Sequence, residues 1–460
     1  MQKNISLIDV IEVFHRDRDQ RYILVINNIK GYNKLISLLF NKSANTDSKN
    51  SDNKISGNYN HNYKYIKSLV SILEDSSHNE EVRKTLSDLR EIDKLFRAAL
   101  TQFDISDMNN TKDENVVIII MHLFTFIGNL CYSVEEIRSK ISEQYAIIVE
   151  KIYKFLEYFE LNNLLHRNII ETVLSFLINL SCYEKFRLTF EQKESKMINF
   201  FIVLIMKELT GNKKYIEKFK NFDDLYERVC CLIYNLSFTT TNSYSLIEFC
   251  VENGIIEIIE NYIDNIFNQE KNSFPNFNNL TEASLQRTLM LTAKITKLRS
   301  GSFDDKFYNS VISLTNLKFL KINSTIIDNS IKILAHYLQG DKLDKTFSKI
   351  DLKILCENLK EIFLFDYLNI DREKERVINN MSVMISVLSI NPEYSTIFKE
   401  IVKNLILIAK EKMDLLRKNS AILLAKIAKS STSMENYVRE LHGMDVLLNI
   451  AKFLQINNNK

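Results

Sequence analysis

The stretch "LLRKNSAILLAKIAKSSTSMENYVRELHGMDVLLNI" (415–450) decides the fold, because its pattern returns at several other places in the chain. Its apolar residues recur at every third or fourth position, as on one face of an α-helix. Gly443 lies where one helical pattern ends and the next begins. A glycine suits that junction, because the residue just past a helix C-terminus often takes the left-handed conformation.

Glycine and proline are scarce along the whole chain. The 460 residues include 8 glycines and 2 prolines, whereas average usage is about 7% glycine and about 5% proline. Turn-rich β architectures need both residues, so the composition predicts an all-α chain. A chain of 460 residues is too long for one compact core, and we expect two or three domains or one elongated array of repeats.

Two further segments share the pattern of the C-terminal stretch. They are "RYILVINNIKGYNKLISLLF" (21–40) and "LIEFCVENGIIEIIENYI" (246–263), and each has a helix end, a glycine and an amphipathic helix. Gly31, Gly254 and Gly443 therefore take equivalent places in a chain that has few glycines. This recurrence indicates an internal repeat.

An asparagine recurs upstream of that junction. The segments "TFIGNLCYS" (125–133), "SFLINLSCY" (175–183) and "CLIYNLSFT" (231–239) align on Asn129, Asn179 and Asn235. Weaker equivalents place Lys294, His336, Val387 and Lys426 at the same position, and the successive spacings are 50, 56, 59, 42, 51 and 39 residues. Stacked units of this kind share one continuous core, because a single unit cannot bury its own apolar face.

These motifs resemble those of the armadillo repeat family. The resemblance covers roughly residues 110–455 and, more weakly, the first 40 residues. It implies an all-α, armadillo-like α-solenoid, in which repeats of about 42 residues form a right-handed superhelix. In that family the third helices of the repeats line a concave groove.

Polar segments divide the predicted array. Residues 1–40 are expected to form an N-terminal helical repeat. Residues 41–63 are rich in asparagine and poor in aliphatic side chains, so they cannot offset the entropy of ordering, and we expect a disordered insert. Armadillo-like repeats are predicted at 64–267, a polar linker or long loop at 268–284, and further armadillo-like repeats at 285–456.

The sequence has no motif for binding nucleotides or metals. Its two closest glycines, Gly31 and Gly57, are 26 residues apart, which excludes the glycine-rich loops that bind phosphate. Neither His-Glu-x-x-His nor Cys-x-x-Cys occurs, and the six cysteines have no regular spacing. We therefore expect no cofactor, no metal, no catalytic residues and no small-molecule substrate.

Charge and hydropathy disfavour two further classes of partner. Sixty basic and 58 acidic residues leave a net charge of +2, without the concentrated basic excess of proteins that bind nucleic acid. The most apolar runs, 116–127 and 197–206, are 12 and 10 residues long, and a membrane-spanning helix needs about 20. No secretion signal is recognisable at residues 1–20, so we expect a cytoplasmic protein, with the nucleus as the alternative.

The adjacent cysteines Cys230 and Cys231 lie about one turn before Asn235. Neighbouring residues of a helix point about 100° apart, so the pair cannot bind one metal ion together without a break in the helix. We expect Cys230 to pack in the core and Cys231 to be a surface thiol on the same face as Asn235.

The recurring asparagines are candidates for binding a partner. In armadillo proteins that bind extended peptides, the resemblance implies hydrogen bonds from groove asparagines to the peptide backbone, and a carboxamide has both donors and an acceptor. The alternative is that each asparagine only stabilises its own helix. The predicted protein-binding groove contains Asn129, Asn179 and Asn235, the residues Thr125, Ser175 and Cys231 four positions earlier, and Lys294 and Lys426 in the C-terminal half. The two lysines suit an acidic partner, or they are solvated positions on a helix face.

The sequence predicts a non-enzymatic scaffold or adaptor that binds a protein or an extended peptide. One alternative is a structural or assembly-factor subunit of a cytoskeletal, axonemal or chaperone complex, and another is an enzyme whose helices surround a site. A nuclear transport adaptor is disfavoured, because such armadillo proteins carry tryptophan four residues before the asparagine and this chain has no tryptophan. Aromatic faces are what attract the cations of nuclear signals.

Overall fold

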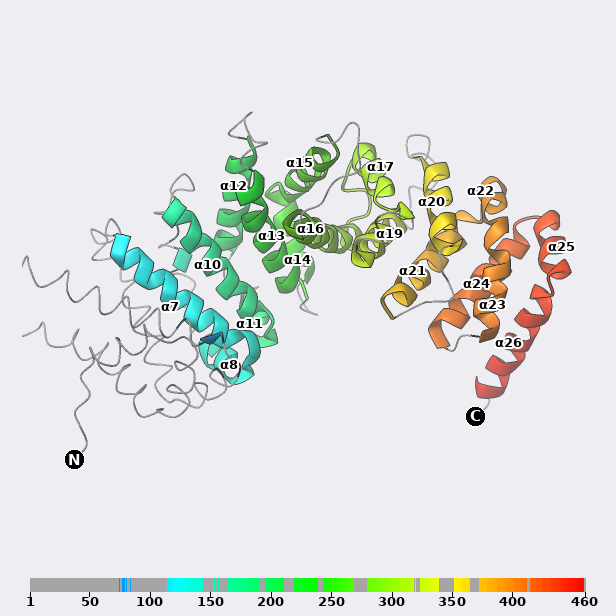
Figure 1. Cartoon of the computed structure of the whole chain (residues 1–460), viewed down its shortest axis with the longest axis horizontal. Coiled ribbons are helices and arrows are strands. Elements are labelled where there is room, and N and C mark those ends of the chain that lie inside the picture. Colours follow the sequence, from blue (N-terminus) through cyan, green and yellow to red (C-terminus); the bar gives the residue numbers. More distant parts are fainter. Residues whose placement is uncertain are drawn as a thin grey trace, which may run out of the picture. The chain divides into compact units, whose positions relative to one another are not determined.

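The computed structural model describes residues 114–143, 164–190, 195–210, 219–238, 243–268, 279–317, 323–338, 351–364, 372–411 and 414–458, with single residues between 74 and 83, between 152 and 156 and at 319. Every element within these ranges is a helix, which confirms the all-α prediction. The chain forms two compact units, Met1–Asn253 and Gly254–Lys460 (Figure 1). The predicted repeat at 1–40, with Gly31, and the predicted insert at 41–63 lie outside the described residues.

Three long helices of unit 1 pack on one another in chain order. These inner helices are α7 (Glu114–Ser133), α10 (Leu164–Ser181) and α13 (Phe219–Leu236). The other described helices of the unit come after the individual inner helices in the chain. They are α8 (Glu135–Glu143) after α7, α11 (Glu184–Phe190) and α12 (Ser195–Thr210) after α10, and α14 (Ser243–Glu252) after α13. Helix α11 packs against α8 and α10, and α12 packs against α13 and α14.

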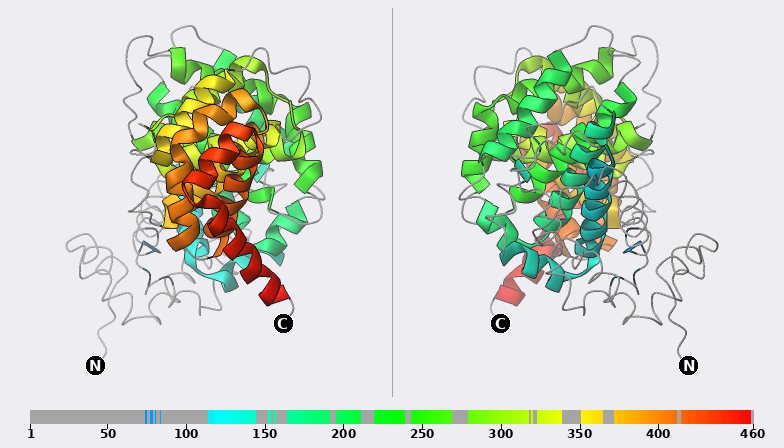
Figure 2. Two further views of the ribbon diagram at one scale, coloured as in Figure 1. Left: turned by 90° about the vertical axis from the view of Figure 1, so that its right-hand side faces the viewer. Right: turned by 90° about the vertical axis from the view of Figure 1, so that its left-hand side faces the viewer.

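Unit 2 has the same plan, with four inner helices that pack in succession. They are α16 (Asn279–Leu298), α19 (Ser324–Leu338), α21 (Arg372–Leu388) and α24 (Asp414–Lys429). The outer helices are α15 (Ile255–Asn268), α17 (Asp305–Ser313), α20 (Leu352–Leu364), α22 (Pro392–Ile397), the 3-10 helix η6 (Phe398–Ile401), α23 (Val402–Glu411), α25 (Thr432–Glu440) and α26 (Gly443–Asn458). Helix α26 ends the series and packs against α23, α24 and α25 (Figure 2).

Polar side chains fix where several outer helices begin. The carboxylate of Asp304 accepts a hydrogen bond from the backbone N–H of Phe307 at the start of α17. Asn391 caps α22 in the same way, and Pro392 follows at a position where its missing N–H has no cost. Ser431 caps α25. This chain, which is poor in glycine and proline, therefore begins these helices with short polar side chains.

The glycine junctions differ between the two repeats in which they are described. Gly254 has φ 91°, so it takes the left-handed conformation that the sequence predicted. At the second junction the left-handed residue is His442, with φ 58°, and Gly443 already belongs to α26. A Cβ atom on Gly443 would lie 2.7 Å from Cγ1 of Val438. Gly443 is therefore required by close packing, and the predicted reason for it was wrong.

Side-chain hydrogen bonds between inner helices reveal the length of each repeat. In unit 1 they join residues 51 to 54 positions apart. In unit 2 they join Asn380 to Asp328, 52 positions away, and Asn419 to Asn379, 40 positions away. These separations agree with the spacings of 50, 56, 51 and 39 that the aligned sequence positions predict.

The two units separate at Asn253 and Gly254, which is the glycine junction between α14 and α15. Helix α16 begins at Asn279, within the residues 268–284 for which the sequence predicts a polar linker or a long loop between repeats. Buried Ser284 and Leu285 belong to the core of unit 2.

Candidate protein-binding surface

Each inner helix is buried except for one narrow stripe. In α7 the stripe passes through Thr125, Asn129 and Tyr132, while the intervening Phe126, Ile127, Leu130 and Cys131 are buried. The period of three to four residues is that of one helix face. The corresponding residues are Ser175 and Asn179 in α10 with Cys182 just after it, and Asn235 in α13 with Phe238 just after it. Arg228 lies on the same face of α13, one turn before the buried Cys231. We call this row of exposed and half-buried positions the inner stripe.

The three predicted asparagines lie on the inner stripe, and each donates a hydrogen bond to the preceding repeat. The Nδ2 atom of Asn129 donates to Ser77 Oγ (3.0 Å), that of Asn179 to the carbonyl of Gly128 (2.9 Å), and that of Asn235 to Ser181 Oγ (3.1 Å). Their Oδ1 atoms accept no hydrogen bond from the described part of the chain. Each carboxamide is therefore held in one orientation by its Nδ2 hydrogen bond.

The serine of the Asn-Leu-Ser motif has a role of its own. Ser181 Oγ donates to the carbonyl of Ile178 (2.6 Å) and accepts from Asn235. Ser77 makes the equivalent pair of contacts, with Glu74 and Asn129. In α7 the same position is Cys131, whose sulfur is a weak acceptor. Asn179 accordingly bonds to a backbone carbonyl instead.

At two places an arginine six residues after the serine donates hydrogen bonds to the backbone carbonyls of that serine and of the next residue. Nη1 of Arg187 donates to the carbonyls of Ser181 (2.9 Å) and Cys182 (3.0 Å). Arg83 makes the same two bonds, to Ser77 (3.0 Å) and His78 (2.9 Å). A guanidinium group satisfies helix C-terminal carbonyls that have no partner within the helix and complements the helix dipole. Sequence analysis missed this serine–arginine pair, although its spacing of six residues is visible in the chain.

The residues predicted one turn before the asparagines also reach the inner stripe. Thr125 Oγ1 donates to the carbonyl of Met121 (3.0 Å), and Ser175 Oγ donates to that of Glu171 (2.9 Å). Ser175 in addition accepts a hydrogen bond from the guanidinium of Arg228 on the next inner helix. Both hydroxyl groups are therefore bonded to their own helix, and Ser175 also links two repeats.

The cysteine pair is buried on both sides of its helix. Cys230 is 0% exposed, as predicted, but Cys231 is only 7% exposed, so the predicted surface thiol was wrong. Its place on the inner stripe is covered. Burial also raises the pKa of Cys131 and raises that of Cys356 to about 12. These thiols stay protonated at neutral pH and pack as small apolar groups.

Both predicted lysines of unit 2 lie on the inner stripe. Lys426 Nζ donates to Ser386 Oγ on the preceding inner helix (3.2 Å). Lys294 is half-buried, and its burial, together with the charge of Lys297, lowers the pKa of its ammonium group. Lys426 thus occupies the place that an asparagine has in unit 1, and it too bonds to the repeat before it.

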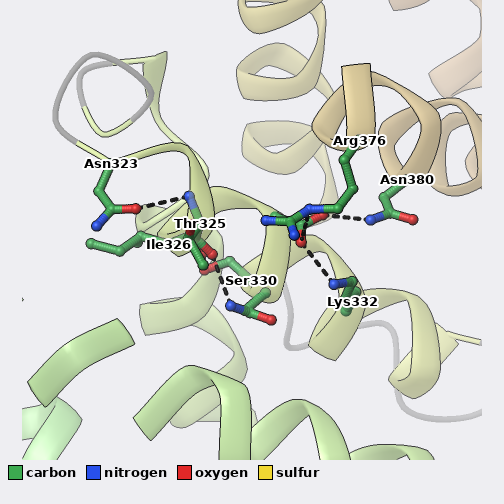
Figure 3. Close-up of polar contacts among 9 residues, drawn as sticks. Asn323, Thr325, Ile326, Ser330, Lys332, Arg376 and Asn380 are labelled. Carbon is green, nitrogen blue, oxygen red and sulfur yellow. Dashed lines mark hydrogen bonds and ion pairs between the residues drawn. The ribbon is translucent and has the colours of Figure 1, made fainter. Parts of the chain in front are cut away.

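Unit 2 also contains a buried carboxylate that the sequence did not indicate. Asp328 on α19 is 1% exposed. Its Oδ2 atom accepts from Lys332 Nζ (2.7 Å) and from Nε of Arg376 on α21 (3.0 Å), and its Oδ1 atom accepts from Asn380 (Figure 3). A buried charge needs paired and hydrogen-bonded partners. Asp328 has both, and they join two successive repeats.

Other types of site find little support in the described ranges. No group of three or more His, Cys, Asp or Glu side chains there is arranged to hold a metal ion. Across the same ranges, none of the helices combines the length and the apolar character that crossing a membrane requires.

No family model matches the chain, and no curated protein matches its sequence. Solved structures do match it. A chain from a structure of the interaction between cadherin and β-catenin aligns with a TM-score of 0.60 at 10% identity, over 96% of this chain and 78% of that chain. The fold is armadillo-like. SYS-1 aligns with a TM-score of 0.58 at 12% identity, over 94% and 77% of the two chains. A structure of SYS-1 with POP-1 aligns with a TM-score of 0.50 at 11% identity, over 81% and 62%.

Proposed function

We propose that the chain is a non-enzymatic scaffold that binds an extended segment of a partner protein along the inner stripe. The row Asn129, Asn179 and Asn235 carries this proposal. Each Nδ2 atom is bonded to the preceding repeat, which aims the carboxamide before any partner arrives. A site that is already ordered loses little conformational entropy on binding.

The repeat spacing suits an extended chain. Packed helices lie about 8–10 Å apart, and an extended chain advances about 3.3 Å per residue. One inner helix therefore corresponds to about three residues of a bound segment. Each Oδ1 atom would accept a backbone N–H from successive parts of that segment, so specificity would come from register and from neighbouring side chains.

The structural relatives support a protein partner, because SYS-1 was solved with POP-1 and the β-catenin structure concerns its interaction with cadherin. We place this function in the cytoplasm or the nucleus. None of the six cysteines forms a disulfide, in agreement with a reducing compartment.

Exchange of two stripe asparagines tests the proposal. The Asn179→Ala, Asn235→Ala double variant removes two acceptors, each worth about 0.5–1.5 kcal/mol, so we expect partner affinity to fall about tenfold or more. The matched control is Asn261→Ala with Asn449→Ala, two exposed residues of the outer helices α15 and α26. Partners are recovered with the full chain from native cells, quantified by mass spectrometry and then measured in solution below the melting temperature of both variants.

The two double variants separate the scaffold from its alternatives. Equal recovery of partners by both would contradict binding through the asparagine row. A fixed stoichiometric assembly that forms with either variant would indicate a structural subunit instead.

A further inference from the structure

The inner stripe of unit 2 carries cationic side chains on three neighbouring helices. They are Lys294 and Lys297 on α16, Lys332 and His336 on α19, and Arg376 on α21. We call these five residues the basic cluster. Lys297 and Arg376 are exposed, and the other three are half-buried. The helices α16, α19 and α21 pack in succession, so the cluster extends over three repeats.

The buried carboxylate of Asp328 holds two members of the basic cluster in place. Arg376 reaches its Oδ2 atom through Nε (3.0 Å), and Lys332 bonds to the same oxygen (2.7 Å) (Figure 3). The Arg376 side chain remains 52% exposed. Because its Nε is bonded to Asp328, the guanidinium is held with its two terminal nitrogens as a planar fork, and neither nitrogen has a partner among the described residues. That fork matches the two oxygens of a carboxylate.

In the described part of the chain, the four lysine and arginine residues of the basic cluster outnumber the carboxylates beside them. These carboxylates are Asp328, which is bonded to Lys332 and Arg376, and the half-buried Glu375, which precedes Arg376 in α21. Burial, then the charge of Lys297, lowers the pKa of Lys294. Burial, then the charges of Lys297 and Lys332, lowers that of His336. The lesser part of each shift comes from neighbouring positive charge, which a bound anion would offset.

We propose that the basic cluster binds an acidic segment of a partner protein. This inference rests on the proposed scaffold function and names the partner chemistry in unit 2. Aspartate or glutamate side chains would pair with Arg376 and Lys332 while the segment follows the stripe across α16, α19 and α21. Such pairs steer the approach of the partner and fix its register more than they add raw affinity.

Exposed aliphatic side chains beside the cluster favour a protein segment over a nucleic acid. Val383 and Ile422 are 40% and 44% exposed. They lie on α21 and α24 between two inter-repeat hydrogen bonds, Asn419 to Asn379 and Lys426 to Ser386. Single-stranded nucleic acids are bound through aromatic stacking, and the exposed large hydrophobic residues described in unit 2 include no aromatic ring.

The test measures binding of a short fluorescent peptide of Asp, Glu and Leu to the full chain by anisotropy. The variant Lys297→Gln with Lys332→Gln removes two cations, and we expect about tenfold weaker binding. The matched control, Lys353→Gln with Lys403→Gln, makes the same change of net charge at exposed sites on the outer helices α20 and α23. It should weaken binding less than about twofold. Thermal unfolding verifies that both variants are folded.

Three outcomes would overturn the proposal: equal weakening by the control pair, equal binding of a peptide with Asn and Gln in place of the acids, or tighter binding of a single-stranded oligonucleotide that is lost in the cluster variant. All these variants keep the asparagine row of unit 1. If the acidic peptide does not bind, the proposed scaffold function is therefore unaffected. If the asparagine variants still bind their partners with unchanged affinity, the acidic-peptide test is unaffected.

Discussion

The two units connect their repeats with different chemistry. In unit 1, neutral carboxamides on α10 and α13 donate to a carbonyl and to a hydroxyl group of the preceding repeat. In unit 2, α19 and α21 meet at the buried carboxylate of Asp328, which is paired with Lys332 and Arg376. Unit 1 thus uses neutral carboxamides at these contacts, and unit 2 contains a buried ion pair.

This difference shows that the fold constrains geometry more than residue type. A repeat array needs contacts between successive inner helices, and both neutral and ionic side chains make such contacts here. The type of side chain affects how strongly each contact depends on charge.

The largest expected effect comes from removing the ionic contact. Breaking a buried ion pair costs about 3–5 kcal/mol, and we expect about 2–4 kcal/mol for Asp328→Ala, because Lys332 and Arg376 can turn partly to solvent. Urea unfolding of the full chain measures it. Removal of an exposed carboxylate on an outer helix, Glu361→Ala, should cost less than about 0.5 kcal/mol. Equal costs would mean that Asp328 does not join the repeats.

The neutral contacts of unit 1 should respond unequally to a negative charge. In Asn179→Asp the carboxylate would face the carbonyl of Gly128, which can only accept, so we expect a loss of about 2–3 kcal/mol. In Asn235→Asp the new oxygen would face Ser181 Oγ, whose hydroxyl can turn and donate. That variant should lose less than about 1 kcal/mol. Urea midpoints of the two variants, with unchanged slopes, measure the difference, and equal losses would show that the acceptor type is irrelevant.

Replacing a glycine by alanine should lower the free energy of unfolding at one position in unit 2 and raise it at one position in unit 1. In Gly443→Ala the new Cβ would lie 2.7 Å from Val438 Cγ1 and 3.1 Å from Ile406 Cδ1, and overpacking of this kind costs about 1–3 kcal/mol. In Gly128→Ala the nearest atom, Phe176 Cα, would be 3.5 Å away. Alanine is the better helix former, so that variant should gain about 0.5–1 kcal/mol. A loss at Gly128 in thermal unfolding would mean that α7 and α10 are closer than described.

The smallest effect is a pH dependence that belongs to unit 2. Burial, and after it the charges of Lys297 and Lys332, lower the pKa of His336 below the ordinary histidine value of about 6.5. As the pH falls below about 6.5 the unfolded chain binds the proton first, so His336 contributes stability above that pH, and the contribution is lost as the pH falls towards the folded-state pKa. His336→Gln should therefore flatten the decline of stability on acidification. Urea unfolding of both proteins at several pH values measures this, and parallel declines would exclude His336 as a cause.

The sequence predicted the helices, the repeat spacing and the row of asparagines, because these depend on local periodicity and on one residue type at a regular interval. It could not indicate that Asp328 meets Arg376, since 48 residues and a repeat boundary separate them. It also could not decide that Cys231 is covered or that His442, rather than Gly443, is left-handed. Those outcomes depend on how neighbouring helices pack, and one helix pattern does not contain that information.

Hydrogen–deuterium exchange of the full chain, with and without the partner recovered from cells, tests the central claim most directly. If the partner binds the inner stripe, amide exchange should slow in α10 and α13 or in α19 and α21. Exchange in the outer helices α15, α20 and α26 should not change. Slower exchange confined to those outer helices would contradict the account.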